Sequence, residues 1–232
     1  MYRHLSTAIE SNPIFRRLFL YRKVFLTKSS RRYYSQFGED ICLGSLVNLK
    51  KKGFYVDVGC YHPTKYSNTF RLYQHGWRGI NIDMDSIKVE ACELKRPHDK
   101  NICVAITDDE SVSSMSMYSH GFYALTSTLE KEQEASFICT RIVPCSTLNH
   151  ILEKESVDTV DLISIDAEGH DLNVLRSIDL TRYSVKTIIV ESFEKFLTDV
   201  LESGIYQHVS NQGFELVNWA GKSLIFQKRG RL

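Results

Sequence analysis

Residues 53–69 read GFYVDVGCYHPTKYSNT. Phe54 to Val58 form a short apolar run that contains one carboxylate, Asp57, and Gly59 follows directly. A run of this length that ends at a glycine is typical of a buried strand that turns into a loop. Because Gly59 lacks a Cβ atom, it permits a tight turn in which backbone N–H groups approach a ligand. The stretch therefore predicts the first strand of an α/β sheet and the ligand-binding loop after it.

Short apolar runs alternate with amphipathic stretches along most of the chain. The predicted strands are 54–58, 79–83, 101–106, 161–166, 186–192, 214–220 and 222–228, and the predicted helices are 35–50, 67–75, 85–95, 168–177 and 193–203. This order predicts an α/β fold with a mostly parallel sheet and helices on both faces. The last two runs are separated only by a turn at Gly221, so we expect a C-terminal antiparallel hairpin.

The length of 232 residues, with 43% hydrophobic content, suits one large domain. We expect this domain over 34–232, preceded by a basic amphipathic arm over 1–33. Residues of about 107–150 are rich in Ser, Met, Thr and Tyr, and we expect an irregular insertion that forms a lid over one edge of the site. Its aromatic residues could stack on a sugar face or pack the lid onto its own core; they are Tyr118, Phe122 and Tyr123.

The positive charge is concentrated at the N-terminal end. Residues 1–34 carry eight Lys and Arg and one acid, whereas the whole chain has a net charge of +1. A balanced total gives no general attraction to nucleic acid, so we predict no nucleic-acid partner. The segment 13–26 interleaves Phe and Leu with four cations. We favour a helix packed on the domain, and the alternative is peripheral contact with the inner face of a membrane.

The six cysteines show no CxxC spacing, and most lie in apolar runs. We interpret them as reduced core thiols, which fits a cytoplasmic setting. No apolar stretch approaches the roughly 20 residues that a bilayer span requires. We therefore expect a cytoplasmic protein that is soluble or peripheral.

The second predicted strand ends at Asp83, where a carboxylate can bind the ribose hydroxyls of a nucleotide. The loop sequence GCYHPT does not satisfy GxGxxG, so a dinucleotide pyrophosphate lacks its glycine-lined cradle. The pattern favours a ligand with an adenosine and no pyrophosphate, and S-adenosylmethionine fits this description. Asp57 would then organise the loop and face the cationic methionine end, or it would only cap the turn. A NAD(P)-dependent oxidoreductase is the alternative from another class.

A second group of polar residues lies in DLISIDAEGHDLNVL, residues 161–175. Acids at a helix start often cap the helix, which would account for Glu168 and Asp171. Asp166 ends the strand on its ligand-facing side, and we expect it to orient an acceptor hydroxyl. His170 or Glu168 would then accept the proton of that hydroxyl.

The same acids also suggest a metal site. Glu191 ends the next predicted strand, so Asp166, Glu168 and Glu191 could converge on a divalent cation. Three hard oxygen ligands would suit Mg²⁺, although strands of a parallel sheet end in acids for other reasons as well.

Taken in order, these motifs resemble the FkbM family of S-adenosylmethionine-dependent methyltransferases. The resemblance covers about 34–192 and rests on YSQFGEDI (34–41), GFYVDVGCYHPTKYSNT (53–69), GWRGINIDMD (76–85), AIT (105–107), TSTL (126–129) and IDAEGHDLNVL (165–175). It implies a class I methyltransferase sheet, which is Rossmann-like, and an enzyme of the EC 2.1.1 class. The implied reaction is O-methylation, often of a sugar hydroxyl in a polysaccharide, lipopolysaccharide or glycosylated natural product, so the expected partner is a glycan or small-molecule acceptor.

The resemblance also implies roles for individual residues. By this resemblance, Asp57 and Gly59 line the cofactor loop, and Ser67 and Asn68 approach the methionine end of the cofactor. Asp83 binds the ribose, and Ala105 and Ile106 flank adenine. Gln36, Glu39 and Asp40 close the pocket. A helix capped at Ser35 is the alternative for the last three. A non-catalytic S-adenosylmethionine-binding module is a further alternative, but such a module would lose the acids Asp166 and Glu168.

Overall fold

The computed structural model describes residues 12–27, 30–119, 127–128 and 139–229. The chain divides into two compact units, Met1–Arg32 and Tyr33–Leu232. In the first unit, helix α2 (Pro13–Phe25) begins after Asn12, whose side chain accepts hydrogen bonds from the N–H groups of Ile14 and Phe15. Proline suits the first helical position because its missing N–H would have no partner within the helix. The sequence Asn-Pro thus fixes where α2 begins.

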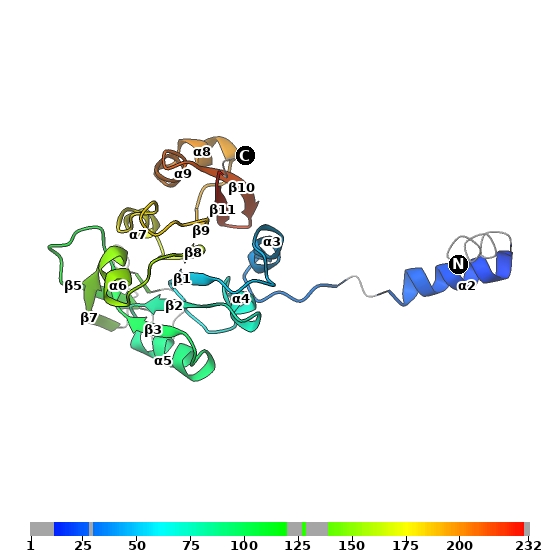
Figure 1. Cartoon of the computed structure of the whole chain (residues 1–232), viewed down its shortest axis with the longest axis horizontal. Coiled ribbons are helices and arrows are strands. Elements are labelled where there is room, and N and C mark those ends of the chain that lie inside the picture. Colours follow the sequence, from blue (N-terminus) through cyan, green and yellow to red (C-terminus); the bar gives the residue numbers. More distant parts are fainter. Residues whose placement is uncertain (1–11, 28–29, 120–126, 129–138, 230–232) are drawn as a thin grey trace. The chain divides into compact units, whose positions relative to one another are not determined.

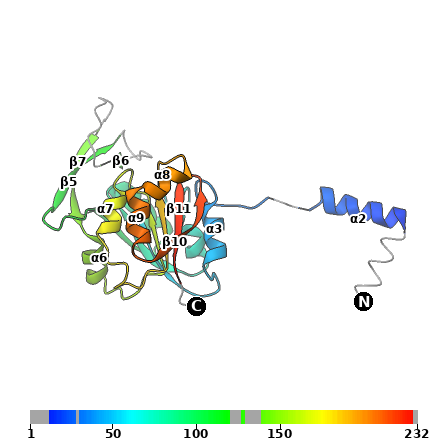
Figure 2. The same ribbon diagram turned by 90° about the horizontal axis from the view of Figure 1, so that it is seen from above.

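The second unit is built on a seven-stranded sheet in the order β10-β11-β9-β8-β1-β2-β3 (Figures 1 and 2). Five neighbouring strands are parallel: β9 (Thr187–Glu191), β8 (Leu162–Ile165), β1 (Phe54–Val58), β2 (Arg78–Asp83) and β3 (Lys100–Cys103). The antiparallel hairpin of β10 (Phe214–Ala220) and β11 (Ser223–Lys228) extends this sheet beside β9. The predicted mostly parallel sheet with a C-terminal hairpin is confirmed.

Helices cover both faces of the sheet (Figure 1). Side chains alternate along each strand, so in β1 Val56 and Val58 enter one hydrophobic core and Tyr55 enters the other. The first core is closed by α6 (Leu148–Lys154), α7 (Asp171–Arg176), α8 (Leu197–Glu202) and α9 (Gly204–Ser210). The second core is closed by α3 (Glu39–Leu46) and α4 (Phe70–Gln74). Helix α5 (Ser86–Lys95) packs beside β2 and β3.

The predicted strand 101–106 is split in two. Strand β3 ends at Cys103, and β4 (Ala105–Ile106) leaves the main sheet to pair with β7 (Cys139–Ser146). Strand β7 also pairs with β5 (Ser114–Ser119), which pairs with β6 (Ser127–Thr128), and this small sheet extends beyond the main one (Figure 2). The expectation of an irregular insertion is therefore wrong for its described part. In the sequence Ser-Met-Ser-Met, Met117 is buried against Ala105 and Val143, so the alternation is that of a half-buried strand.

The predicted helices are longer than the observed ones. The range 35–50 shortens to Glu39–Leu46, and 193–203 shortens to Leu197–Glu202. Ser203 is extended and its hydroxyl accepts a hydrogen bond from the N–H of Tyr206, so it starts the separate helix α9. Within the described part of the chain, no helix is long and apolar enough to cross a membrane. Five of the cysteines are free thiols: Cys42, Cys60, Cys92, Cys103 and Cys145.

Candidate active site

A cavity opens at the carboxyl ends of β1, β2 and β8, where open α/β sheets bind their ligands. It measures about 1030 Å³ when space open to solvent is included, which is large enough for a nucleotide-sized ligand. The structure brings five predicted cofactor residues into its walls: Gln36, Gly59, Asp83, Ala105 and Ile106. The predicted catalytic residues Asp166, Glu168 and His170 line the same cavity, as does Glu191.

Gly59 shapes the floor of the cavity. Its φ angle is +79°, a left-handed conformation that favours glycine. The backbone N–H groups of Gly59 and Cys60 both donate to the carbonyl oxygen of Ile82, at 2.9 and 3.2 Å. These bonds turn the chain sharply out of β1 and hold the loop against the end of β2. The loop therefore has the tight turn that the sequence predicted.

Asp83 is held in a fixed orientation at the end of β2. Its Oδ2 accepts a hydrogen bond from the N–H of Tyr61 at 3.1 Å, and its Oδ1 accepts one from the N–H of Asp85 at 2.9 Å. Burial raises the pKa of Asp83, and the nearby charge of Lys88 opposes this effect. Each oxygen keeps a further lone pair, so the carboxylate can accept hydrogen bonds from two ligand hydroxyls.

An apolar slot lies beside Asp83. Its walls come from the end of β2 and from β4, and they include Ile82, Met84, Val104, Ala105 and Ile106. A flat heteroaromatic ring is the kind of group that such a slot accommodates. Ala105 and Ile106 lie in this slot, and their contact with adenine stays a prediction.

Two tyrosines form an aromatic wall that the sequence analysis missed. The rings of Tyr61 and Tyr66 are stacked at 6.4 Å between centroids, and both line the cavity. Both residues have positive φ, at 35° and 59°. Bulky residues rarely adopt this conformation, and such strain is concentrated at functional sites. The signal available in the sequence was the position of both aromatics in the loop directly after the first strand.

Glu168 lies in a tight turn between β8 and α7. It has a φ of 49°, and the next residue, Gly169, has a φ of 97°. The buried carboxylate of Asp171 accepts hydrogen bonds from the N–H groups of Ala167 and Gly169, at 3.0 and 3.2 Å. Asp171 therefore fixes the turn that presents Glu168 to the cavity. Partial burial and the neighbouring charge of Asp166 raise the pKa of Glu168 to about 7.

Asp166 and Glu191 form a carboxyl pair at the ends of β8 and β9. Solvent in the cavity reaches Asp166, but protein packed around its other sides removes part of its hydration. This desolvation and the charge of Glu191 raise the pKa of Asp166 well above its usual range. A hydrogen bond joins the two side chains, so the pair shares one proton and keeps one negative charge beside Glu168. The ammonium of Lys222 lies 3.7 Å from Oε1 of Glu191.

These acids do not form a metal site in the structure. Among the described residues, no group of three or more His, Cys, Asp or Glu side chains is placed to hold a metal ion. The expectation of Mg²⁺ at Asp166, Glu168 and Glu191 therefore has no support from the described residues.

Two further polar groups face this region. Among the described residues, the buried Nδ1 atom of His170 has no hydrogen-bond partner, and the His170 side chain lines the cavity. Lys88 is 3% exposed and lines the cavity, with its ammonium 5.3 Å from the centroid of the Tyr61 ring. Its charge lowers the pKa of both Asp83 and Glu168. The sequence analysis missed Lys88, because nothing in the sequence distinguishes it from any other lysine of an amphipathic helix.

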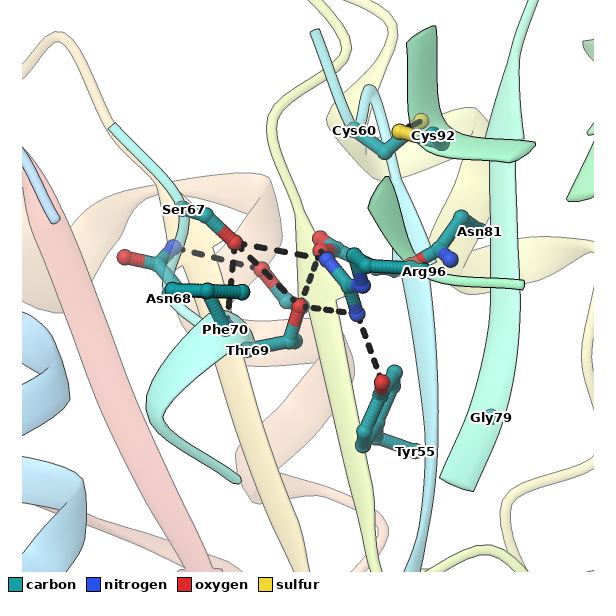
Figure 3. Close-up of polar contacts among 12 residues, drawn as sticks. Tyr55, Cys60, Ser67, Asn68, Thr69, Phe70, Gly79, Asn81, Cys92 and Arg96 are labelled. Carbon is teal, nitrogen blue, oxygen red and sulfur yellow. Dashed lines mark hydrogen bonds and ion pairs between the residues drawn. The ribbon is translucent and has the colours of Figure 1, made fainter. Parts of the chain in front are cut away.

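The structure places Asp57, Ser67 and Asn68 outside the cavity wall. They belong to a polar cluster around Thr69 and Arg96, of which Figure 3 labels Ser67, Asn68, Thr69 and Arg96. Strand alternation turns Asp57 to the same face as Tyr55, under α4, and there it accepts a hydrogen bond from the hydroxyl of Thr69. Ser67 accepts a hydrogen bond from the N–H of Phe70, and Asn68 donates to the hydroxyl of Ser164 at 3.2 Å. These contacts fix the loop on its side away from the cavity. They do not place Asp57, Ser67 or Asn68 in direct contact with a ligand.

Arg96 is at the centre of this cluster and is fully buried. It donates to the hydroxyls of Tyr55 and Thr69 at 2.6 and 2.9 Å and to the carboxylate of Asp99 at 2.9 Å. Its Nη1 lies 3.7 Å from Oδ2 of Asp57. One guanidinium thus links β1, the segment before α4 and the end of α5 (Figure 3). Sequence reasoning missed Arg96 because no motif surrounds it.

The segment 36–40, which leads into the first turn of α3, contributes one of its three predicted residues to the cavity. Gln36 lines the cavity, whereas Glu39 and Asp40 are buried away from it. Asp40 accepts a hydrogen bond from the hydroxyl of Ser35 at 2.7 Å, and the hydroxyl of Ser223 donates to Glu39 at 3.2 Å. The two acids anchor this segment to the domain.

A parallel α/β sheet with a carboxylate, an apolar slot and a glycine turn at its carboxyl edge defines a Rossmann-like protein with a nucleotide-type site. The chain belongs to the methyltransferase FkbM domain family, whose model matches residues 57–216, more than half of the chain. A search of curated proteins found no match.

Solved structures with a similar fold include several methyltransferases. A TehB-like SAM-dependent methyltransferase from Corynebacterium glutamicum is 16% identical, with 94% of this chain and 100% of that chain covered and a TM-score of 0.44. A putative caffeoyl-CoA O-methyltransferase from Staphylococcus aureus is 9% identical, with 99% and 98% covered and a TM-score of 0.47. Precorrin 8W decarboxylase from Methanobacterium thermoautotrophicum is 15% identical, with 88% and 97% covered and a TM-score of 0.45. With all three TM-scores below 0.5, the assignment rests on the family match.

Proposed function

We propose that this methyltransferase uses S-adenosylmethionine to methylate a hydroxyl group, with a sugar as the acceptor. The observation that carries the proposal is Glu168, a carboxylate in the cavity wall whose pKa is raised to about 7. A general base works best when its pKa lies near the working pH, because it is then both ionised and able to accept a proton. A strained turn held by Asp171 presents this group to the cavity.

The residues of the cavity fit S-adenosylmethionine. Asp83 offers free carboxylate lone pairs to the ribose hydroxyls, and Ala105 and Ile106 lie beside it in the apolar slot for adenine. The turn at Gly59 has no room for a side chain, because a Cβ atom there would meet the backbone carbonyl of Asp166. The loop lacks the glycines of a pyrophosphate cradle, which argues against NAD(P).

The chemistry needs alignment and the removal of one proton. The bound cofactor would supply a methyl group on a sulfonium, which transfers in line to an oxygen nucleophile. The residues of this chain hold the acceptor and take its proton: the O–H bond of the acceptor breaks, and the proton passes to the carboxylate of Glu168. The carboxyl of Asp166 shares its proton with Glu191, so its other oxygen would accept a hydrogen bond from a neighbouring hydroxyl of the acceptor and help to orient it. The unpartnered Nδ1 of His170 is a second group for this task.

A sugar acceptor is supported by the aromatic wall. Tyr66 is 40% exposed, stacks with Tyr61 and lies beside the cavity, so its face can pack against the apolar face of a sugar ring. The cations Lys65 and Lys88 lie over these two rings, at 4.6 and 5.3 Å from the centroids of Tyr66 and Tyr61. A sugar that carries an acidic group would be favoured by these charges.

The test is calorimetric titration of the full chain with S-adenosylmethionine, with its demethylated product and with NAD. We expect binding of the first two in the micromolar range, no binding of NAD, and loss of binding in Asp83→Ala. Asp83→Asn is the matched control, because it keeps the shape and one acceptor oxygen and should bind more weakly without losing binding. Absence of S-adenosylmethionine binding by the native protein, or equal binding by D83A, would refute the cofactor assignment.

The acceptor is tested separately by transfer of a labelled methyl group to a panel of sugars and glycans, read by mass spectrometry. We expect Tyr66→Ala to raise the KM for the acceptor about fivefold or more, since the loss of a stacking contact costs on the order of 1 kcal/mol. The affinity for S-adenosylmethionine should stay unchanged in this variant. Transfer to nitrogen or sulfur acceptors alone would contradict O-methylation.

A further inference from the structure

Helix α2 exposes an unusual amount of apolar surface. None of its residues is buried, and its large apolar side chains are between 42% and 71% exposed. Ile14, Leu18, Tyr21 and Phe25 follow the spacing i, i+4, i+7 and i+11, so they form one stripe along the helix. Contiguous apolar surface of this kind marks a site of interaction with another molecule or with a membrane.

The charges around the stripe indicate what covers it. At about 100° per residue, Arg16 and Lys23 lie opposite the stripe, while Arg17 and Arg22 flank it on its two sides. The chain continues with Lys28, Arg31 and Arg32, and residues 13–32 contain no acid. An apolar stripe bordered by cations is the pattern of a helix that lies in the headgroup region of a membrane. Seven cations without an acid are complementary to anionic lipid headgroups.

We propose that α2 and the following basic segment bind the surface of an anionic lipid bilayer, with the stripe Ile14, Leu18, Tyr21 and Phe25 inserted among the lipids. The aromatic members suit this position, because their rings favour the boundary between headgroups and acyl chains. Rings of Tyr21 and Phe25 already contact each other at 4.9 Å between centroids. The helix begins at a capped and proline-fixed turn, so it is defined before any lipid is bound. The proposal does not depend on the reaction that the cavity performs.

The test is co-sedimentation of the full chain with vesicles. We expect binding to vesicles of phosphatidylcholine mixed with phosphatidylglycerol, and at least about tenfold weaker binding to phosphatidylcholine alone or in high salt, which screens the charges. Arg17→Gln combined with Arg22→Gln, which removes the two cations that flank the stripe, should weaken binding to the mixed vesicles about 25-fold, at about fivefold per charge.

A matched pair of single substitutions separates insertion from simple charge attraction. Leu18→Gln removes an apolar side chain from the stripe, whereas Leu20→Gln removes the same side chain from the opposite side of the helix, where it is 50% exposed. We expect L18Q to weaken vesicle binding about tenfold and L20Q to leave it nearly unchanged. The melting temperature of both variants should equal that of the native protein.

Three results would overturn the proposal: no binding of the native protein to the mixed vesicles, equal binding to neutral vesicles, or equal losses in L18Q and L20Q. The alternative occupant of the stripe is a second copy of this chain. Sedimentation velocity without lipid tests it, since a dimer that L18Q dissociates and L20Q does not would assign the stripe to self-association and refute the lipid proposal.

Discussion

A Cβ atom on residue 59 would lie 1.8 Å from the backbone carbonyl oxygen of Asp166. Gly59 follows β1 and Asp166 follows β8, so this contact brings the turn of the cofactor loop directly against the start of the candidate catalytic segment. The N–H of Asp166 also donates to the carbonyl oxygen of Val58 at 3.0 Å, which locks the two strand ends together. The position of the cavity floor therefore depends on the absence of a side chain at one residue.

Gly59→Ala should damage both stability and cofactor binding. Gly76 provides the control, because its φ of +88° is equally left-handed but a Cβ there would meet nothing within 4 Å. Gly76→Ala should lower the free energy of unfolding by only about 1 kcal/mol, which is the cost of placing a residue with a Cβ atom in the left-handed conformation. G59A should cost about 1–3 kcal/mol more, because backbone must move to admit the methyl group. Urea unfolding measures both, and equal losses would show that the contact with Asp166 is not tight.

Much of this site could be predicted because backbone position follows from the order of elements. Asp83 ends β2, and Gly59 and Asp166 directly follow β1 and β8. The carboxyl ends of neighbouring parallel strands meet at one edge of the sheet. The alternation of apolar runs that gives this order is visible in the sequence. The sequence therefore predicts that Gly59, Asp83 and Asp166 lie at one site, and all three line the cavity.

Asp57 and Lys88 show what could not be predicted. Asp57 lies one position before the strand end, and the twofold alternation of a strand turns it to the other face, where Arg96 and Thr69 surround it. Lys88 enters the cavity because α5 packs beside β2 with this residue inward, and helix orientation depends on tertiary packing. Side-chain direction at a strand end and helix rotation are set by contacts far away in the sequence.

Arg96→Met should destabilise the domain strongly. The guanidinium is fully buried between the carboxylates of Asp57 and Asp99, so its removal leaves buried negative charge without a counter-charge. Removing one partner of a buried ion pair costs about 3–5 kcal/mol in the free energy of unfolding. The exposed pair of Arg182 with Glu153 supplies the control, and Arg182→Met should change little. Urea unfolding at neutral pH distinguishes them; a small loss in R96M would mean that Asp57 and Asp99 are protonated or rehydrated.

Lys88→Met should raise the pKa of Glu168 above its value of about 7, because the ammonium of Lys88 stabilises the ionised carboxylate. The same substitution should raise the pKa of Asp83. Lys222 also lowers the pKa of Glu168, but its effect ranks below that of Lys88 and its side chain is 54% exposed. Carboxyl carbon shifts in an NMR titration should therefore move further in K88M than in Lys222→Met. A smaller movement in K88M would show that the ammonium points away from Glu168.

The raised pKa of Glu168 also predicts how stability depends on pH. In the unfolded chain this carboxyl has its ordinary pKa of 4.5, and in the folded protein the pKa is about 7. Below pH 4.5 the carboxyl is protonated in both the folded and the unfolded state, so it does not lower the free energy of unfolding. Above pH 7 it is ionised in both states, and the folded protein bears the full cost of holding the partly buried charge. The contribution of Glu168 to stability therefore falls as the pH rises from about 4.5 to about 7.

Glu168→Gln removes this penalty and keeps the shape of the side chain. We expect E168Q to be more stable than the native protein by about 1–2 kcal/mol at pH 8, a figure reduced for partial exposure of the side chain. The gain should vanish near pH 4, where native Glu168 is neutral as well. Glu90→Gln, at an exposed position of α5, is the control and should give no gain that grows with pH. If E168Q gains stability and loses methyl transfer, Glu168 is a group that serves the reaction at a cost in stability. If E168Q instead loses stability at pH 8, the charge of Glu168 is satisfied in the folded protein, and the basis for assigning it as the base is removed.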